Sequence, residues 1–379
     1  MRLRTWHLSL CSTILLLCGA CGNSNGNSST PPPTAASHFA YVSNSDSSNI
    51  TAYKMDSASG GLSAVSGSPF GGVDAPLGLA LNPSADLLAA GNLNGGRISV
   101  FRVNKTSGAI TPVAGSPFST TGGGFPARSV FHTSGKFLYT GLMLNATSDI
   151  SGFAVDSTTG ALTPLAGSPF PGQAFTGGGG VQSLAVHPAG TFLYASGFFT
   201  GITGYAVDNA SGELAQLAGS PFNPAGTFFN STLVVHPSGK FLYMADFDVD
   251  GVRVFPIAAD GSLGAEITGS PFVSGTGARD IALDPSGKFA YVVNDGDTNV
   301  AAFSVNATSG ELTLIGNVDT GISPFALTVD SSGKFLYVSN QTDGNVSAYA
   351  INSATGALAT VTGSPFPAAN SPISIVATK

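Results

Sequence analysis

Short apolar runs alternate with turn residues over most of the chain. In residues 231–272, STLVVHPSGKFLYMADFDVDGVRVFPIAADGSLGAEITGSPF, the pattern gives strands at TLVV, FLYMA and GVRVFPI and a weaker fourth strand at LGAEIT. The HPSGK and AADGS segments between them carry the Pro and Gly residues that tight turns need. Four short strands without helical periodicity indicate an all-β unit.

The same unit recurs along the chain. Seven second strands align as FAYVSN, LLAAGN, FLYTGL, FLYASG, FLYMAD, FAYVVN and FLYVSN, and residues 38–378 give about 49 residues per unit. A period of this size is typical of repeat architectures, and four strands per unit favour a propeller over a sandwich. The sequence therefore predicts an all-β domain over residues 38–379, a seven-bladed β-propeller with four antiparallel strands per blade.

The order of strands predicts how the ring closes. The repeats begin on a second strand at residues 38–44 and end on a first strand at residues 371–378. Two unpaired blade edges would remain unless these segments pair with each other. We therefore expect the C-terminal strand to complete the N-terminal blade.

A GSPF motif follows the fourth strand of six units. Its serines are Ser68, Ser116, Ser168, Ser220, Ser270 and Ser364, and a seventh copy is expected near residue 317, where the chain reads LIGNVDTG. An outermost strand tolerates Pro because its N–H needs no partner. The Phe can then insert between blades, where its burial contributes roughly 1.5–3 kcal/mol. We interpret the motif as architectural.

The first 37 residues differ in kind. Residues 1–20 join a basic start to the apolar run LSLCSTILLLC and small residues before Cys21. This layout is typical of an export signal and resembles that of a bacterial lipoprotein, with Cys21 as the lipidated residue; a plain secretory signal is the alternative. Residues 21–37 are expected to form a flexible tether. The prediction is an exported protein of the bacterial cell envelope or periplasm, anchored to the membrane only through the lipid at Cys21.

Charge and cysteine content exclude several classes of protein. Lys+Arg number 14 against 21 Asp+Glu, a net charge of −7. Because no basic run is present, nucleic acid is not an expected partner, nor is a membrane bound by electrostatics. The three cysteines lie within residues 1–21, so the predicted propeller has no disulfide. We expect a monomer.

In six repeats the position just before the turn that follows the first strand is occupied by His, Asn or Asp. The residues concerned are His132, His187, His236, Asn82, Asp284 and Asp330. A slot that accepts all three residue types indicates side-chain capping of the turn, not catalysis or metal binding.

Loops that enter first strands and loops that join second to third strands reach the same rim of the channel in this register. The ionisable residues on that rim are Arg128, Asp246, Asp248, Asp250, Arg279, Asp280, Asp295 and Asp297. Two aromatic pairs, Phe198–Phe199 and Phe228–Phe229, lie near it; packing between blades is their simpler interpretation, ligand contact the alternative. The glycine runs TTGGGFP and FTGGGGV lack the helix and Lys of a phosphate-binding loop.

The repeats resemble the seven-bladed lactonase family, which includes 6-phosphogluconolactonase and the carboxymuconate cycloisomerases, and also the Tyr-Val-Thr-Asn repeat propellers. The resemblance rests on the P-SGKFLYV-N pattern and on FLYMADFDVDGVRVF followed by GARDIALDPSGKFAYVVNDGDTNV. The residues that match the family pattern are Asp246, Asp250, Arg279 and Asn294. Those that depart from it are Asp280, Asp295 and Ser231, where the family has His, Glu and a second His.

The resemblance implies lactone hydrolysis at the channel mouth. Such a reaction needs a base that delivers water and a cation that holds a carboxylate or oxyanion. We expect Arg279 to hold the anion and Asp295 to act as the base, with Asp280 as a third catalytic candidate. The expected substrate-binding residues are Arg128, Asp246, Asp250 and Asn294.

No cofactor is expected, and calcium is the weaker alternative. Asp246, Asp248 and Asp250 alternate as in a calcium loop, but the twelfth position is Ile257 and the stretch leads into a strand. Two functions stay open: a hydrolase acting on a small-molecule lactone, and a non-catalytic, lipid-anchored propeller that binds a protein, glycan or small ligand of the envelope.

Overall fold

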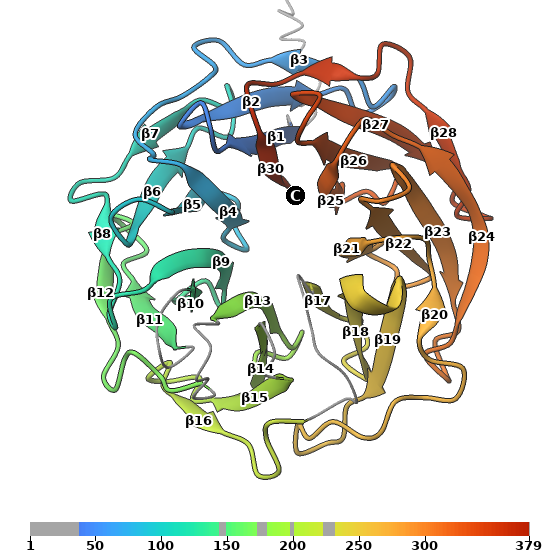
Figure 1. The fold of residues 1–379 in the computed structure, drawn as a ribbon. Coiled ribbons are helices and arrows are strands. Elements are labelled where there is room, and N and C mark those ends of the chain that lie inside the picture. Colours follow the sequence, from blue (N-terminus) through green and yellow to red (C-terminus); the bar gives the residue numbers. More distant parts are fainter. Residues whose placement is uncertain (1–37, 144–148, 173–179, 198–200, 223–231, 379) are drawn as a thin grey trace, which may run out of the picture. The chain divides into compact units, whose positions relative to one another are not determined.

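Seven antiparallel sheets surround a central axis in the computed structural model (Figure 1). The model describes residues 38–143, 149–172, 180–197, 201–222 and 232–378, which belong to one unit, Ser37–Lys379. Each sheet runs from an inner strand at the axis to an outer strand at the circumference. The predicted all-β propeller with seven blades of four antiparallel strands is confirmed.

The strands fall into four concentric layers. The inner strands are β4 (Pro76–Leu81), β9 (Phe125–Phe131), β13 (Val181–Val186), β17 (Thr232–Val235), β21 (Ala278–Leu283), β25 (Pro324–Val329) and β30 (Pro372–Ala377). The second strands are β1 (His38–Asn44), β5 (Leu87–Asn92), β10 (Phe137–Met143), β14 (Phe192–Gly197), β18 (Phe241–Asp246), β22 (Phe289–Asn294) and β26 (Phe335–Asn340).

The two outer layers follow. The third strands are β2 (Asn49–Met55), β6 (Arg97–Val103), β11 (Ile150–Val155), β15 (Ile202–Val207), β19 (Gly251–Pro256), β23 (Asn299–Val305) and β27 (Asn345–Ile351). The outer segments are β3 (Leu62–Ala64), β7 (Ile110–Pro112), β8 (Phe118–Ser119), β12 (Leu162–Pro164), β16 (Leu214–Gln216), β20 (Phe272–Val273), β24 (Leu312–Asp319), β28 (Leu358–Thr360) and β29 (Phe366–Pro367). One 3-10 helix, η1 (Phe247–Val249), follows β18. We number the blades by their second strands, so that β1 belongs to blade 1 and β26 to blade 7.

Blade 1 closes the ring as predicted. Its strand order is β3-β2-β1-β30, with Tyr41 opposite Val376 and Val42 opposite Ile375. The N–H of Thr378 also donates to the carbonyl of Phe39. The last strand of the chain is therefore the inner strand of the first blade.

The GSPF motif interrupts the outer strand, whereas the sequence placed it after that strand. In blade 1, Ala64 pairs with Tyr53, and pairing resumes when Phe70 bridges Ile50. Between these points the Oγ of Ser68 accepts the N–H of Ala52 at 2.8 Å. The six GSPF serines precede cis prolines and accept the equivalent third-strand N–H.

Seven apolar clusters fill the seams between blades. Each cluster joins residues of two neighbouring blades, as where Tyr53 of blade 1 meets Tyr337 of blade 7. The six GSPF phenylalanines each pack against a different cluster. The expected insertion of this Phe between blades is thus confirmed, and apolar burial at these seams is the main force that holds the blades together.

A repeated latch also crosses the seams at the rim opposite the channel mouth. In blade 5, Phe241 packs against Gly310 of blade 6, where a Cβ would lie 2.7 Å from its ring, and the hydroxyl of Tyr243 donates to the carbonyl of the same Gly310. Equivalent tyrosine bonds leave blades 1, 3, 4, 6 and 7.

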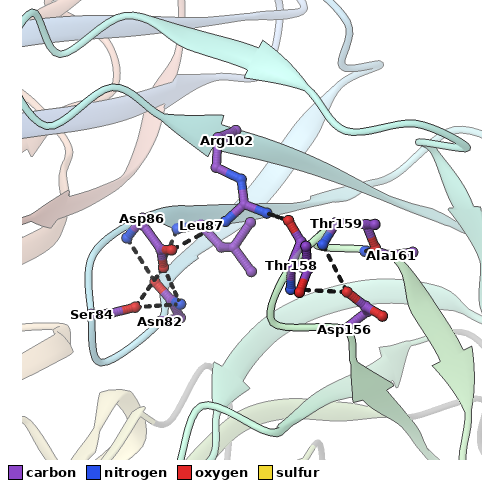
Figure 2. A network of polar contacts seen from close by, with 9 residues as sticks. All are labelled: Asn82, Ser84, Asp86, Leu87, Arg102, Asp156, Thr158, Thr159 and Ala161. Carbon is purple, nitrogen blue, oxygen red and sulfur yellow. Dashed lines mark hydrogen bonds and ion pairs between the residues drawn. The ribbon is translucent and has the colours of Figure 1, made fainter.

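Blade 2 has a different latch because Ala89 takes the tyrosine position. Arg102 reaches across the seam instead and donates to the carbonyl of Thr158 at 2.7 Å, while its other nitrogen pairs with Asp86 at 3.1 Å (Figure 2). Leu87 replaces the phenylalanine against Gly160.

The histidines cap turns, as their slot predicts, and they also cross the seams. Nδ1 of His132 bonds Ser134 in its own turn, and Nε2 lies 2.8 Å from the carbonyl of Gly190 in blade 4. His187 and His236 make the same kind of contact with Gly239 and Gly287 of the next blade. These imidazoles are structural and lie at the rim away from the channel mouth.

Candidate functional site at the channel mouth

A cavity of about 180 Å³ opens where the inner strands converge. Its lining residues are Leu77, Gly78, Ala127, Arg128, Met143, Gln182, Thr232, Arg279, Phe325, Ile373 and Ser374. All seven inner strands, which surround the axis in Figure 1, contribute lining residues, so the cavity lies on the propeller axis. Drug-sized ligands occupy pockets of about 300–1,000 Å³, so this volume fits a smaller molecule of single-ring size.

β-Bulges aim the side chains that line this cavity. In β21 the pairing shifts between Ala278 and Asp280, so Arg279 has no partner residue on β22. The same register shift occurs at Phe325 in β25 and at Gln182 in β13. A bulge residue is turned out of the regular alternation of a strand. This irregularity, which also occurs at Ile373 in β30, therefore presents different side chains to the cavity from four blades.

Arg279 is held between a carboxylate and an aromatic ring. Its Nη1 donates to Oδ2 of Asp295 at 2.8 Å, and its guanidinium carbon lies 3.7 Å from the ring centre of Phe325. The side chain is only 18% exposed, and burial lowers the pKa of Arg279 while Asp295 raises it. The guanidinium stays charged at neutral pH because its ordinary pKa is far higher.

Arg128 brings a second positive charge to the same cavity. Its Nη1 lies 3.3 Å from Oδ1 of Asp280, and the charge of Arg128 also contributes to the lowered pKa of Arg279. Two predicted residues from blades far apart in sequence, Arg128 and Arg279, thus lie at one site. Paired guanidinium groups in a partly buried cavity suit a carboxylate or a developing oxyanion.

Asp280 is a structural bridge as well as a neighbour of Arg128. It is 3% exposed; Oδ1 accepts the N–H of Ile281 at 3.0 Å and Oδ2 accepts the N–H of Leu327 in blade 7 at 3.1 Å. Ser183 and Ser374 come directly after the bulge residue in their own strands, as Asp280 does. They accept the N–H groups of Leu233 and Leu79 in the next blade. This geometry favours a positioning role for Asp280 over direct chemistry.

Asp295 stands directly after β22 and behind Arg279. Its side chain is 24% exposed and pairs with Arg279, and it does not itself line the cavity. The predicted base therefore adjoins the cavity only through Arg279, which does line it.

Two other predicted residues, Asn294 and Asp250, hold loops. Asn294 is fully buried; its Nδ2 donates to Asn299 and to the carbonyl of Ser274. Asp250, at φ 56°, accepts the N–H of Gly277 through Oδ1. These bonds tie the loop before β21 to the blades on both sides, so they position the segment that carries Arg279.

Asp246 is turned away from the cavity. It is 0% exposed, and its Oδ2 pairs with Nε of Arg253 at 2.7 Å, while Oδ1 caps η1 by accepting the N–H of Asp248. Burial raises the pKa of Asp246, and the bond with Arg253 opposes that shift. Arg253 also pairs with Glu266, which accepts the hydroxyl of Ser270. Asp246, which matches the lactonase family pattern, therefore belongs to a network of ion pairs and hydrogen bonds inside blade 5.

The aspartates considered for calcium do not gather around one point. Asp246 pairs with Arg253 and Asp250 with a backbone N–H. Within the described part of the chain, no group of three or more His, Cys, Asp and Glu side chains is arranged to hold a metal ion. Over those same residues, no helix has the length and apolar character needed to span a bilayer.

Several lining residues carry no signal of their own in the sequence. Gln182, Thr232 and Phe325 are uncharged and sit in ordinary strand patterns, but Gln182 and Phe325 occupy the repeat position of Arg279. Superimposing the repeats on that position would have found them. Phe198, Phe199, Phe228, Phe229 and Cys21 lie outside the described residues.

Comparison with known families decides the relationship. A model of the family described as lactonase, 7-bladed beta-propeller, matches residues 33–123, 116–223, 178–270 and 265–376. The chain belongs to this lactonase family. A 6-phosphogluconolactonase of Pectobacterium carotovorum subsp. carotovorum (strain PC1) is 36% identical over 74 residues, 18% of this chain and 21% of that protein. The match thus spans about a fifth of the curated relative's length.

Solved structures show the same fold as this lactonase-family chain. A proposed 6-phosphogluconolactonase from Bacteroides uniformis ATCC 8492 has a TM-score of 0.77 and 21% identity, covering 90% of this chain and 100% of that one. A periplasmic gluconolactonase of Pseudomonas aeruginosa has a TM-score of 0.75 and 20% identity, covering 91% and 99%.

Proposed function

We propose that this propeller hydrolyses a small lactone in the cavity at the channel mouth. The observation that carries the proposal is the convergence of Arg128 and Arg279 on a single-ring cavity in a lactonase-family chain. In this reaction Arg279 and Arg128 hold the carbonyl oxygen as it becomes an oxyanion. Asp295 takes the proton of the attacking water as the new C–O bond forms, and returns it to the ring oxygen when the acyl C–O bond of the lactone breaks; Asp280 fixes Arg128.

The substrate is a sugar lactone or a related lactone, and the protein acts outside the cytoplasm. The basic and apolar residues 1–20 before Cys21 support export and a lipid anchor. Export also accords with the fold shared with a periplasmic gluconolactonase of Pseudomonas aeruginosa.

A panel of aldonolactones and simple lactones, followed by pH-stat titration of the released acid, tests the proposal. Replacing Arg279 by Ala should lower kcat/KM by about 10²–10³-fold, the cost of losing one oxyanion donor. Asp295→Asn should lower kcat more than it raises KM. Arg97→Ala, an exposed arginine at the start of β6, is the matched control and should leave activity unchanged. No turnover of any lactone by the unmodified chain would overturn the proposal.

A binding function without catalysis is the second candidate. It is favoured by the engagement of both acidic neighbours, Asp295 with Arg279 and Asp280 with two backbone N–H groups and Arg128. The ligand would be a small carboxylate or another envelope molecule. Calorimetric binding of an aldonate that Arg279→Ala abolishes, with no lactone turnover, would select this function.

A further inference from the structure

The outer edge of blade 6 differs from that of every other blade. In blade 1, residues 64 and 70 of the outer segment pair with Tyr53 and Ile50 of the third strand, and the GSPF turn lies between them. In blade 6 the equivalent third-strand residues, Phe303 and Val300, pair with residues 314 and 318, so the connection is shorter. As a result β24 runs for 8 residues, with one register shift at Ile315, whereas the other outer segments have two or three.

β24 presents an open edge. It ends the sheet order β21-β22-β23-β24, so no described strand pairs with its far side. Alternate N–H and C=O groups of an edge strand point outward and form a template for another strand. Natural edges are protected by charged side chains, Pro, bulges or short strand length. β24 has one bulge at Ile315, but its sequence LTLIGNVD contains no Lys or Pro, and Leu314 is 50% exposed.

A small cavity lies beside this edge. It has about 120 Å³, and its lining residues are Ala302, Ile315, Gly316, Asn317 and Val318 of blade 6 and Ala357 and Leu358 of blade 7. Side chains of a strand added to β24 would point alternately to the two faces of the sheet. The seam between blades 6 and 7 keeps a small space next to β24.

The charges at the two ends of β24 indicate the kind of strand. Glu311 and Asp319 are exposed and flank an uncharged stretch. In an antiparallel pair of two copies, Glu311 of one would lie beside Asp319 of the other, and like charges across strands are destabilising. We propose that the β24 edge binds an extended segment of another protein, with Lys or Arg at both ends of an uncharged, partly apolar stretch. The strand adds to the blade 6 sheet by main-chain hydrogen bonds.

A designed peptide tests this directly. The probe is Lys-Thr-Val-Thr-Leu-Thr-Val-Thr-Lys with blocked ends and a fluorophore, whose lysines match the spacing of Glu311 and Asp319. Fluorescence anisotropy with the full chain should show saturable binding, and the same peptide with Glu at both ends should bind about tenfold more weakly, the effect of two exposed ion pairs. Leu314→Lys, a change at an exposed site, should weaken binding of both peptides.

Charge reversal supplies the decisive comparison. The double variant Glu311→Lys/Asp319→Lys should invert the preference and bind the Glu-ended peptide better. Glu213→Lys is the matched control, because Glu213 precedes β16 in blade 4, where the GSPF turn breaks the outer strand. Equal unfolding midpoints would show that the variants are folded. No saturable binding of the Lys-ended peptide, or no inversion in the double variant, would overturn the proposal. So would a dimer in sedimentation that Leu314→Lys dissociates, because the occupant would then be a second copy.

Discussion

The two rims of the propeller use the same repeat in opposite ways. At the rim with the TG turns, almost every blade repeats one contact, a Phe against a Gly and a Tyr hydroxyl on its carbonyl. At the mouth, the bulge position changes from Gln182 to Arg279, Phe325 and Ile373. Uniform side chains mark positions that hold blades together, and varied side chains mark a position that is free to serve a ligand.

The largest expected effect is a loss of stability at the rim with the TG turns. Phe241→Ala removes a ring that is 6% exposed and packs against Gly310 across a seam. The resulting cavity should lower the free energy of unfolding by about 3–5 kcal/mol, measured by urea denaturation.

Phe325→Ala at the mouth is the matched change, since this ring is only partly buried beside the cavity. It should cost clearly less stability while altering KM for the lactone substrate. Equal losses of stability for the two variants would remove the distinction between the rims.

Substitutions of Asp280 test whether this residue of the mouth stabilises the fold. Asp280→Ala leaves the buried N–H of Leu327 without its acceptor, which should cost about 1–3 kcal/mol of unfolding free energy. Asp280→Asn keeps an oxygen for that N–H and should restore most of the stability. If Asp280→Ala were as stable as the unmodified chain, Asp280 would not be a framework residue.

The smallest expected effect is on the pH of acid unfolding, and it comes from the turns at the rim with the TG turns. Asp56, Asp156 and Asp208 accept N–H groups in their turns, and these bonds lower the pKa of each carboxyl. Their stabilising contribution is present above the ordinary carboxyl pKa of about 4 and is lost as the pH falls through the lowered pKa.

Asn104 makes the same turn contacts without titrating. The triple variant D56N/D156N/D208N should therefore unfold at a slightly lower pH than the unmodified chain in an acid titration followed by circular dichroism. An unchanged acid midpoint would mean that the turns contribute nothing to acid stability.

The fold could be predicted because every blade repeats the same pattern of strands and turns. FLYMAD and its equivalents fix the buried second strands, and the strand order at residues 38–44 and 371–378 fixes the closure. The GSPF motif was placed correctly between blades but wrongly at the end of its strand, because the Ser68 Oγ that replaces a strand acceptor leaves no trace in a hydrophobic pattern.

The site was less open to prediction. Arg128 and Arg279 could be named because charge is rare in this chain and both enter inner strands. Asp246 could not be told from a mouth residue, because its partner Arg253 is set by pairing with the next strand. The bulge that aims Arg279 depends on tertiary pairing of β21 with β22, which local sequence does not encode.

The closure of blade 1 has a consequence for engineering. The N–H of Thr378 donates to the carbonyl of Phe39, and the N–H of Phe39 donates to Oγ1 of Thr378, so the two ends of the ring are neighbours in one sheet. A short linker could join them, and new termini could be opened in the exposed turn at Gly95 of blade 2, which takes no part in the latch. A circularly permuted chain of this kind would keep all seven sheets while moving the fusion point to another part of the circumference.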